Sequence, residues 1–238
     1  MNIFFVIFYQ PIFNLLVYLY NVVPVHDLGI AIVILTLIIR LLLYPLSKKS
    51  IKSQKEMQSI QPDIEQIKEK YKGNKEKMGP ELMALYKEKK INPFSSCLPL
   101  LIQLPFLFAV YRVFFNLLKK EDAMEALYSF VANPGVLNSI SFGFLNLGET
   151  SIILALLAGA AQYWQSKMLM SKKKSSGGMG AMNKQMLYIM PVITVLIGSR
   201  FPAGLTLYWL LTTLFSVGQQ YIVLGFKSKK TTVEVVDK

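Results

Sequence analysis

The sequence has almost none of the side chains that enzymes and metalloproteins rely on. Its 238 residues include one cysteine, Cys97, and one histidine, His26. A single cysteine forms no intrachain disulfide, and no His and Cys cluster has the spacing of a metal site. The sequence also has no phosphate-binding loop and no Ser, His and Asp set for nucleophilic catalysis. We therefore expect no enzyme, no catalytic residue, no metal site and no cofactor.

Basic residues are absent from the first 39 positions and abundant directly afterwards. Residues 40–90 contain thirteen Lys and Arg, in a chain of formal net charge +12. Hydrophobic residues make up 53% of the chain and charged residues 17%, which is too apolar for an ordinary soluble domain. The basic residues form blocks between long uncharged stretches, as in the cytoplasmic loops of membrane proteins. We therefore expect no DNA partner, and anionic lipid or ribosomal RNA as secondary partners.

Five apolar stretches have lengths typical of helices that cross a membrane. A spanning helix needs about 20 apolar residues, and no acid or histidine lies deep inside these stretches. The predicted fold class is an all-α integral membrane protein with five transmembrane helices. The predicted spans are residues 28–46, 93–118, 150–170, 185–198 and 203–226, and a tight turn at 199–202 joins the last two.

The connecting segments predict the orientation of the chain. Residues 47–92, 171–184 and 227–238 carry most of the Lys, whereas residues 119–149 have two Lys and four acids. Cytoplasmic loops are enriched in Lys and Arg. With five spans, the amino terminus is therefore expected outside and the carboxyl terminus in the cytoplasm.

Residues 1–27 are predicted to form an extracytoplasmic segment. Met1–Val25 is uncharged and rich in aromatic residues, but it lacks the basic start and cleavage site of a signal peptide. Gln10 and Pro11 are expected to break this stretch near its middle. We predict an interfacial helix over residues 11–20, and a sixth span is the alternative.

The segment 47–92 has a helical pattern of its own. Its apolar positions at helical spacing are Ile60, Ile64, Ile67 and Tyr71, followed by Leu82, Leu85 and Tyr86. Residues 72–74 (Lys-Gly-Asn) and 79–80 (Gly-Pro) are expected to break the pattern between them. This predicts an amphipathic cytoplasmic helical hairpin, which is either a solvated stalk or a docking arm for incoming chains or a translocation partner.

Arg40 lies well inside the first predicted span. It follows Leu28 by twelve residues, or about 18 Å along a helix. An arginine in hydrocarbon costs about 2.5–3.5 kcal/mol on insertion scales, so it normally faces water or a partner. The alternative is that the side chain snorkels to the inner interface. No acid lies within the predicted spans to pair with it.

Further polar residues lie inside the predicted spans. Thr36 is one turn before Arg40, and Gln103 lies in the second span. The third span contains Gln162 and Gln165. The last span carries a polar stripe of Trp209, Thr212, Thr213, Ser216 and Gln220. Each of these residues alone is explained by hydrogen bonding between helices. Together with Arg40 they predict a hydrated, positively charged groove.

Four pieces of the sequence resemble the YidC family of bacterial insertases, within the YidC/Oxa/Alb superfamily. They are TLIIRLLLYP at 36–45, NPFSSCLP at 92–99, QLP at 103–105 and FPAGLTLYW at 201–209. The resemblance implies five transmembrane helices around a hydrophilic groove, with Arg40 as the groove arginine and Thr36 as its neighbour. Gln162 or Gln165 is similar to a polar groove residue, and Tyr208 with Trp209 resembles the aromatic pair that borders the substrate path.

The resemblance implies a membrane protein insertase and chaperone of the bacterial plasma membrane. Nascent membrane proteins and the lipid bilayer are the expected partners, a Sec translocon and the ribosome are further candidates, and a monomer is expected to be active. The predicted groove residues are Arg40, Thr36, Gln103, Gln162, Tyr208, Trp209, Thr212 and Ser216. The alternatives from the residues are a small solute or ion transporter and an assembly scaffold for membrane complexes.

Overall fold

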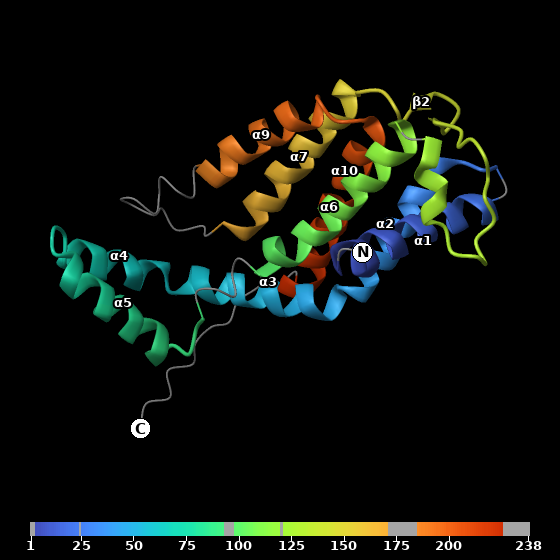
Figure 1. Ribbon diagram of the computed structural model, residues 1–238. Helices are drawn as coiled ribbons and strands as arrows, with labels where there is room; N and C mark the ends of the chain where they lie inside the picture. The colour runs from blue at the N-terminus through green and yellow to red at the C-terminus, as the bar shows by residue number, and fades with distance from the viewer. Residues whose placement is uncertain (1–2, 24, 93–97, 120, 171–184, 226–238) are drawn as a thin grey trace.

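The computed structural model describes residues 3–23, 25–92, 98–119, 121–170 and 185–225, and this part of the chain is mostly helical (Figure 1). The helices are η1 (Phe5–Tyr9), α1 (Gln10–Val22), α2 (Leu28–Leu42), α3 (Tyr44–Ser59), α4 (Gln61–Lys70), α5 (Lys75–Glu88), α6 (Leu98–Lys119), η3 (Glu121–Ala126), α7 (Ile152–Leu169), η4 (Gln185–Ile189), α9 (Met190–Gly198) and α10 (Ala203–Leu224). Strands β1 (Ile140–Ser141) and β2 (Leu145–Asn146) form one small antiparallel pair, which the prediction of an all-α chain did not include.

Within the described residues, two helices are long and apolar enough to cross a membrane. They are Phe5–Val22 and Ala203–Leu224, and a third candidate is the bent pair of α2 and α3. Shorter apolar helical stretches run over Gln103–Leu117 and Gln185–Gly198. Helices α2, α6, α7, η4 with α9, and α10 overlap the five predicted spans in that order.

Helix α2 ends before the predicted end of the first span, because the chain bends at Leu43. Helix α2 ends at Leu42, and α3 begins at Tyr44 at an angle of 66° to it. Pro45 lies in the first turn of α3, where a missing backbone N–H is tolerated. The Gln219 side-chain amide of α10 donates a hydrogen bond to the Tyr44 carbonyl at 3.2 Å. The bend is therefore held by the neighbouring helix α10.

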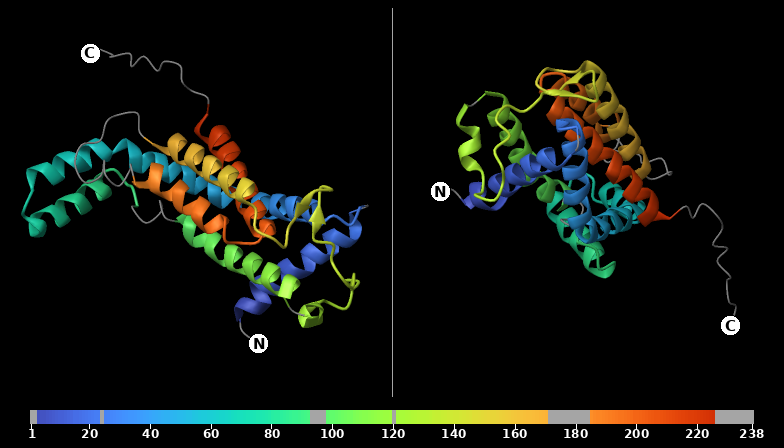
Figure 2. Two further views of the ribbon diagram at one scale, coloured as in Figure 1. Left: turned by 90° about the horizontal axis from the view of Figure 1, so that it is seen from above. Right: turned by 90° about the vertical axis from the view of Figure 1, so that its right-hand side faces the viewer.

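Helices α4 and α5 form a hairpin that projects from one end of the bundle (Figure 2). Its small apolar core contains Ile60, Ile64 and Leu85, all buried. The turn at residues 72–74 lies where it was expected, but the predicted break at Gly79-Pro80 is wrong because Pro80 lies inside α5. The Asn74 side chain caps this helix by accepting from the Lys77 amide, and packing against α4 keeps the helix continuous through the proline.

The predicted break at Gln10 and Pro11 is also wrong. A π-helical turn, η1, leads directly into α1, and Pro11 lies in the first turn of α1. The backbone N–H of Gln10 donates to the Phe5 carbonyl, which closes a wide, π-helical turn. This turn allows Pro11 to follow without an interruption of the helix.

The segment 121–151 covers the end of the bundle opposite the hairpin, and we refer to these two ends as the loop end and the hairpin end. The Ala203 amide donates to the Glu149 carbonyl at 2.6 Å, and the Gly204 amide donates to the Leu147 carbonyl at 3.0 Å. An isolated bridge also pairs Thr150 with Pro202. The first turn of α10 is thus tied to the residues that precede α7.

The start of α2 is fixed to the same loop through Asp27. Its side chain accepts hydrogen bonds from the Gly29 and Ile30 amides at 2.7 and 3.1 Å, and from the Phe142 amide at 2.6 Å. Desolvation raises the pKa of the Asp27 carboxyl, but these backbone bonds and a hydrogen bond with Ser141 outweigh it. The pKa therefore lies below its ordinary value.

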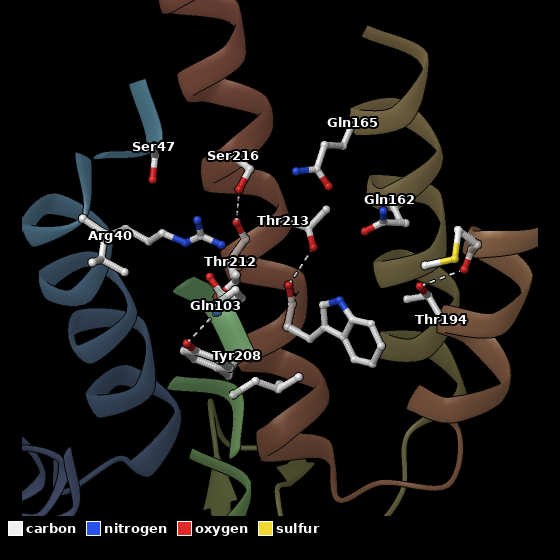
Figure 3. A pocket seen from close by; sticks show the side chains of 14 residues that line it. Arg40, Ser47, Gln103, Gln162, Gln165, Thr194, Tyr208, Thr212, Thr213 and Ser216 are labelled. Atoms are coloured by element: carbon white, nitrogen blue, oxygen red, sulfur yellow. Dashed lines mark hydrogen bonds between the residues drawn. The ribbon is translucent and has the colours of Figure 1, made fainter. Parts of the chain in front are cut away.

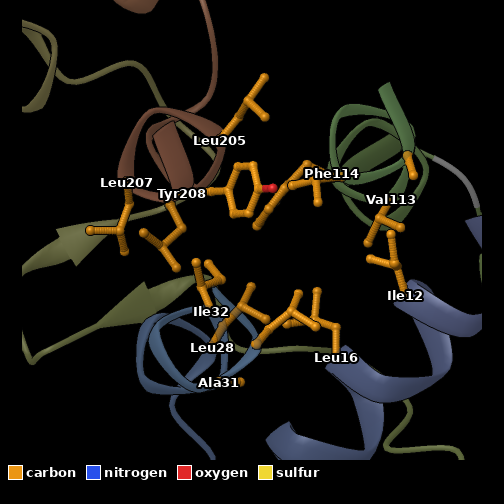
Figure 4. Packing of buried hydrophobic residues seen from close by; sticks show 14 of the residues in the cluster. Ile12, Leu16, Leu28, Ala31, Ile32, Val113, Phe114, Leu205, Leu207 and Tyr208 are labelled. Carbon is orange, nitrogen blue, oxygen red and sulfur yellow. The ribbon is translucent and has the colours of Figure 1, made fainter. Parts of the chain in front are cut away.

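An apolar core fills the loop-end half of the bundle, where side chains of α1, α2, α6 and α10 converge (Figure 4). Phe114 and Tyr208 are each 1% exposed. A Cβ added to Gly204 would lie 2.4 Å from a ring carbon of Phe114, so only glycine allows α6 and α10 to approach this closely. This half of the molecule is packed without space for a ligand at that contact.

Candidate functional site

A cavity of about 280 Å³ opens in the bundle between the apolar core and the hairpin end (Figure 3). Side chains of α2, α3, α6, α7, α9 and α10 line it, together with Leu43 at the bend. The lining residues are Arg40, Leu43, Ser47, Gln103, Leu107, Gln162, Gln165, Met190, Thr194, Tyr208, Trp209, Thr212, Thr213 and Ser216. Each of the five predicted spans therefore contributes at least one polar side chain.

Seven of the eight predicted groove residues line this cavity, and Thr36 does not. Thr36 is buried, and its hydroxyl donates to the Ile32 carbonyl at 2.7 Å, one turn back along α2. Gln162 and Gln165, the two candidates for the polar groove residue of the third span, both line the cavity.

Arg40 supplies the positive charge of the cavity. Its side chain is half-buried and extends from α2 towards α10, ending near Thr212 and Ser216 (Figure 3). In the part of the chain that the structure describes, its guanidinium has no carboxylate partner and no hydrogen bond to protein. Its N–H donors are therefore available to water or to a ligand inside the cavity.

Three hydroxyl groups of the cavity bond to their own helices. Thr213 and Ser216 donate to carbonyls one turn earlier in α10, each at 2.9 Å, and Thr194 does the same in α9 at 3.0 Å. Each hydroxyl is thus satisfied as a donor while its oxygen can still accept a hydrogen bond. These three hydroxyls therefore present acceptors near Arg40 without linking their helices to a neighbour.

Tyr208 marks the boundary between the cavity and the apolar core. Its ring packs in the core, whereas its hydroxyl accepts a hydrogen bond from the Gln103 side-chain amide at 3.2 Å (Figures 3 and 4). Beyond this pair, Leu205 and Phe114 are 1% exposed and Ile32 is fully buried. The cavity is consequently closed towards the loop end by packed side chains.

Comparison with known proteins points to one family. The model of the family described as 60Kd inner membrane protein matches residues 18–230. The membrane protein insertase YidC of Fusobacterium nucleatum is 36% identical over 200 residues, which cover 84% of this chain and 87% of the relative. This chain belongs to the 60Kd inner membrane protein family.

Other relatives in this family differ in length. The YidC insertase of Clostridium tetani is 36% identical over 207 residues, or 87% of this chain and 86% of the relative. That of Syntrophobacter fumaroxidans is 40% identical over 200 residues, which cover 83% of this chain but 34% of the relative. The chain thus spans about a third of the Syntrophobacter protein and most of the Clostridium and Fusobacterium proteins.

Some lining residues were not predicted as site residues. Thr194 is the one polar side chain of α9, and its position in an otherwise apolar helix is a signal that sequence analysis could have used. The predicted first span ends at residue 46, which places Ser47 in the segment that follows it. The bend at Leu43 instead brings Ser47 back to the cavity.

Proposed function

We propose that this protein is a membrane protein insertase, and that its cavity receives the polar part of an incoming polypeptide. The observation that carries the proposal is Arg40, a half-buried arginine that has no carboxylate partner in the described part of the bundle. It lies among acceptor side chains in a chain that belongs to the family of the YidC insertases. A cation in this position favours an acidic or polar segment of a substrate over an apolar one.

The proposed topology places five spans across the bilayer, with the hairpin end in the cytoplasm. The basic residues of the hairpin and of segments 171–184 and 227–238 support this orientation through the positive-inside rule. The loop end, which has more acids than lysines, then faces outward. The amino terminus is outside, the carboxyl terminus is cytoplasmic, and the cavity faces the cytoplasm.

Contacts of α1 support an interfacial position for this helix, although its composition also suits a span. Near its start, the Asn14 side chain donates to the Ala126 carbonyl at 2.9 Å and accepts from the Tyr128 amide. Near its end, the Asn21 side chain donates to the Ala132 carbonyl at 2.7 Å, and Tyr20 accepts from the Asn138 amide. Because the loop bonds to both ends of α1, we infer that this helix runs along the membrane surface.

Partitioning of the substrate drives insertion in this proposal. Each Leu, Ile, Phe or Val of a new span gains about 0.3–0.6 kcal/mol in the bilayer, so ATP is not needed. The barrier is the transfer of the polar tail across the hydrocarbon. A water-filled cavity that reaches partway across shortens the dry distance, and Arg40 offers a transient partner to an acidic tail. A membrane potential adds about 2.3 kcal/mol per charge per 100 mV.

The cytoplasmic hairpin is the proposed docking arm. Lysines and glutamates alternate along α4 and α5, while the apolar residues pair within the hairpin. A charged surface of this kind suits transient contacts with a nascent chain, a Sec translocon or the ribosome. The insertase itself is proposed to act as a monomer, because the cavity is formed within one chain.

Reconstitution into liposomes that contain only this protein tests the proposal. The substrate is a single-span protein with a short acidic tail, and the readout is protection of the tail from added protease. We expect protected tail above the level of protein-free liposomes, and crosslinks from probes at Trp209 or Thr212 to the substrate. Absence of both, together with passage of a small solute through the same liposomes, would replace the insertase by a transporter.

A further inference from the structure

A second arginine lies in a helix of the bundle, on a face that is largely exposed. Arg112 belongs to α6 and is exposed. Phe108, Tyr111 and Phe115 share this face at helical spacing and are 57%, 38% and 40% exposed. The opposite face of α6, which includes Val113, is buried in the apolar core. In a membrane protein, an exposed aromatic stripe of this kind faces lipid.

The stripe forms one wall of a surface cavity of about 520 Å³. The residues that line it are Phe4, Phe108, Tyr111, Arg112, Phe115 and Asn116. The second wall comes from Phe4, which directly precedes η1. Helix η1 is held against α6, because the Asn116 side chain donates to the Tyr9 hydroxyl at 2.8 Å. Phe8 of η1 also packs edge-on against Phe106 of α6, with ring centroids 5.5 Å apart. The cavity is therefore a built cleft between two helices.

Contacts of the neighbouring residues show where Arg112 lies between the loop end and the hairpin end. The Tyr111 ring lies 5.6 Å from the ring of Phe201, which is in the turn between α9 and α10. Phe114 contacts Gly204 in the first turn of α10. Arg112 thus lies level with the loop-end start of α10, where the polar headgroups of the adjacent leaflet begin if α10 spans the bilayer.

We propose that this cleft binds one phospholipid of the loop-end leaflet, with its phosphodiester on Arg112 and an acyl chain along the aromatic stripe. A guanidinium matches the geometry of a phosphate oxygen pair, and in the described part of the chain no carboxylate pairs with Arg112. Phe4 and Phe108 supply apolar walls, and the Asn116 amide lies beside the headgroup position. A lipid of net negative charge, such as phosphatidylglycerol, is favoured because the ammonium of phosphatidylethanolamine opposes the cation.

Titration of the purified full-length protein in detergent with phosphatidylglycerol, followed by native mass spectrometry, tests this site. We expect one tightly retained lipid on the wild type and about tenfold weaker retention on Arg112→Gln. The matched control is Arg200→Gln, which removes an equal charge from the exposed α9–α10 turn and should retain the lipid as the wild type does. Phe108→Ala keeps the charge and should weaken retention about threefold.

Several outcomes would overturn the proposal. One is equal retention by the wild type and Arg112→Gln, and another is equal loss from Arg200→Gln. Complete displacement of the lipid by excess inorganic phosphate would show a bare anion site without acyl recognition. Retention of an acidic peptide in place of phosphatidylglycerol would show that the cleft binds a polypeptide and not a lipid. If Arg112→Gln does not stay monodisperse, the Phe108→Ala variant decides, and unchanged retention by that variant also contradicts the proposal.

Discussion

The two halves of the bundle differ in how their polar groups are satisfied. In the loop-end half, polar groups bond across elements, as Thr206 does by donating to the Gly198 carbonyl at 3.0 Å, and the remaining space is filled by apolar side chains. In the hairpin-end half, Thr213 and Ser216 bond back to their own helix beside the cavity around Arg40. The bonds across elements in that half come from Gln103 and Gln219. The same helix, α10, takes part in both halves. We infer that one half maintains the fold, and we propose that the other is kept open for a ligand.

Removal of Arg40 should give the largest functional effect. Arg40→Ala deletes the only cation among the described residues that line the cavity, and a hydrogen bond to a charged group is worth about 1.5–3 kcal/mol. We expect the initial rate of tail protection to fall about tenfold or more for an acidic-tailed substrate and less than about twofold for a neutral-tailed one. Arg40→Lys, which keeps the charge, should recover part of the rate. Equal losses for both substrates would show that the charge plays no electrostatic role.

Substitution of Gly204 should give the largest effect on stability. In Gly204→Ala the new methyl group would overlap the Phe114 ring, and overpacking of this kind costs about 1–3 kcal/mol. The thermal midpoint in detergent should fall. Gly218 of the same helix is the matched control, since a Cβ there meets nothing within 4 Å, and Gly218→Ala should leave the midpoint unchanged or raise it. A similar fall in both variants would mean that the close approach is not what limits stability.

Substitutions of two threonines of α10 test the difference between the two halves of the bundle. Thr206→Val removes a buried bond between helices, and such bonds contribute about 0.6 kcal/mol on average in membranes, so stability should decrease slightly with insertion unchanged. Thr213→Val removes an acceptor from the cavity wall, so the insertion rate should fall by less than about threefold with the thermal midpoint unchanged. Each variant is the other's control in paired thermal and insertion measurements. The difference between the halves would be contradicted if Thr206→Val slowed insertion while Thr213→Val lowered the thermal midpoint.

The smallest expected effect concerns Asp27 and pH. Because its pKa in the folded protein lies below the ordinary value of 3.8, the charged carboxylate stabilises the fold at pH values above 3.8. That contribution is lost as the pH falls from 3.8 through the lower, folded-state pKa. Asp27→Asn keeps a capping side chain but removes the charge, and should cost under about 1 kcal/mol near neutral pH. The thermal midpoints of the wild type and Asp27→Asn should converge in acid. A difference that does not change with pH would show that the charge of Asp27 does not contribute to stability.

Much of the bundle could be predicted because apolar runs and basic blocks are local features of a sequence. The polar stripe on α10 and the position of Arg40 were visible for the same reason. Proline was the main source of error, since Pro11 and Pro80 both lie inside continuous helical segments. Whether a proline interrupts a helix depends on its surroundings. A wide turn precedes Pro11, and packing against α4 supports the helix around Pro80. Periodicity carries no information about either.

The features that sequence could not provide depend on contacts between distant residues. The hydrogen bond from the Phe142 amide to Asp27 joins positions 115 residues apart, and the strand pair at 140–146 is formed around it. The lining role of Ser47 follows from the bend at Leu43, which no local pattern specifies. Thr36 likewise lies one turn before Arg40 on α2, but packing buries it and it does not line the cavity.

The hydroxyls that bond back to their own helices have a consequence for turnover. When a segment leaves the cavity, Thr194, Thr213 and Ser216 keep their donated bonds, and water alone has to refill the acceptor positions. Vacating the site therefore breaks no bond within the protein and requires no rearrangement of the walls. In the proposed mechanism, the cavity can therefore be filled and emptied repeatedly while these three hydrogen bonds stay in place.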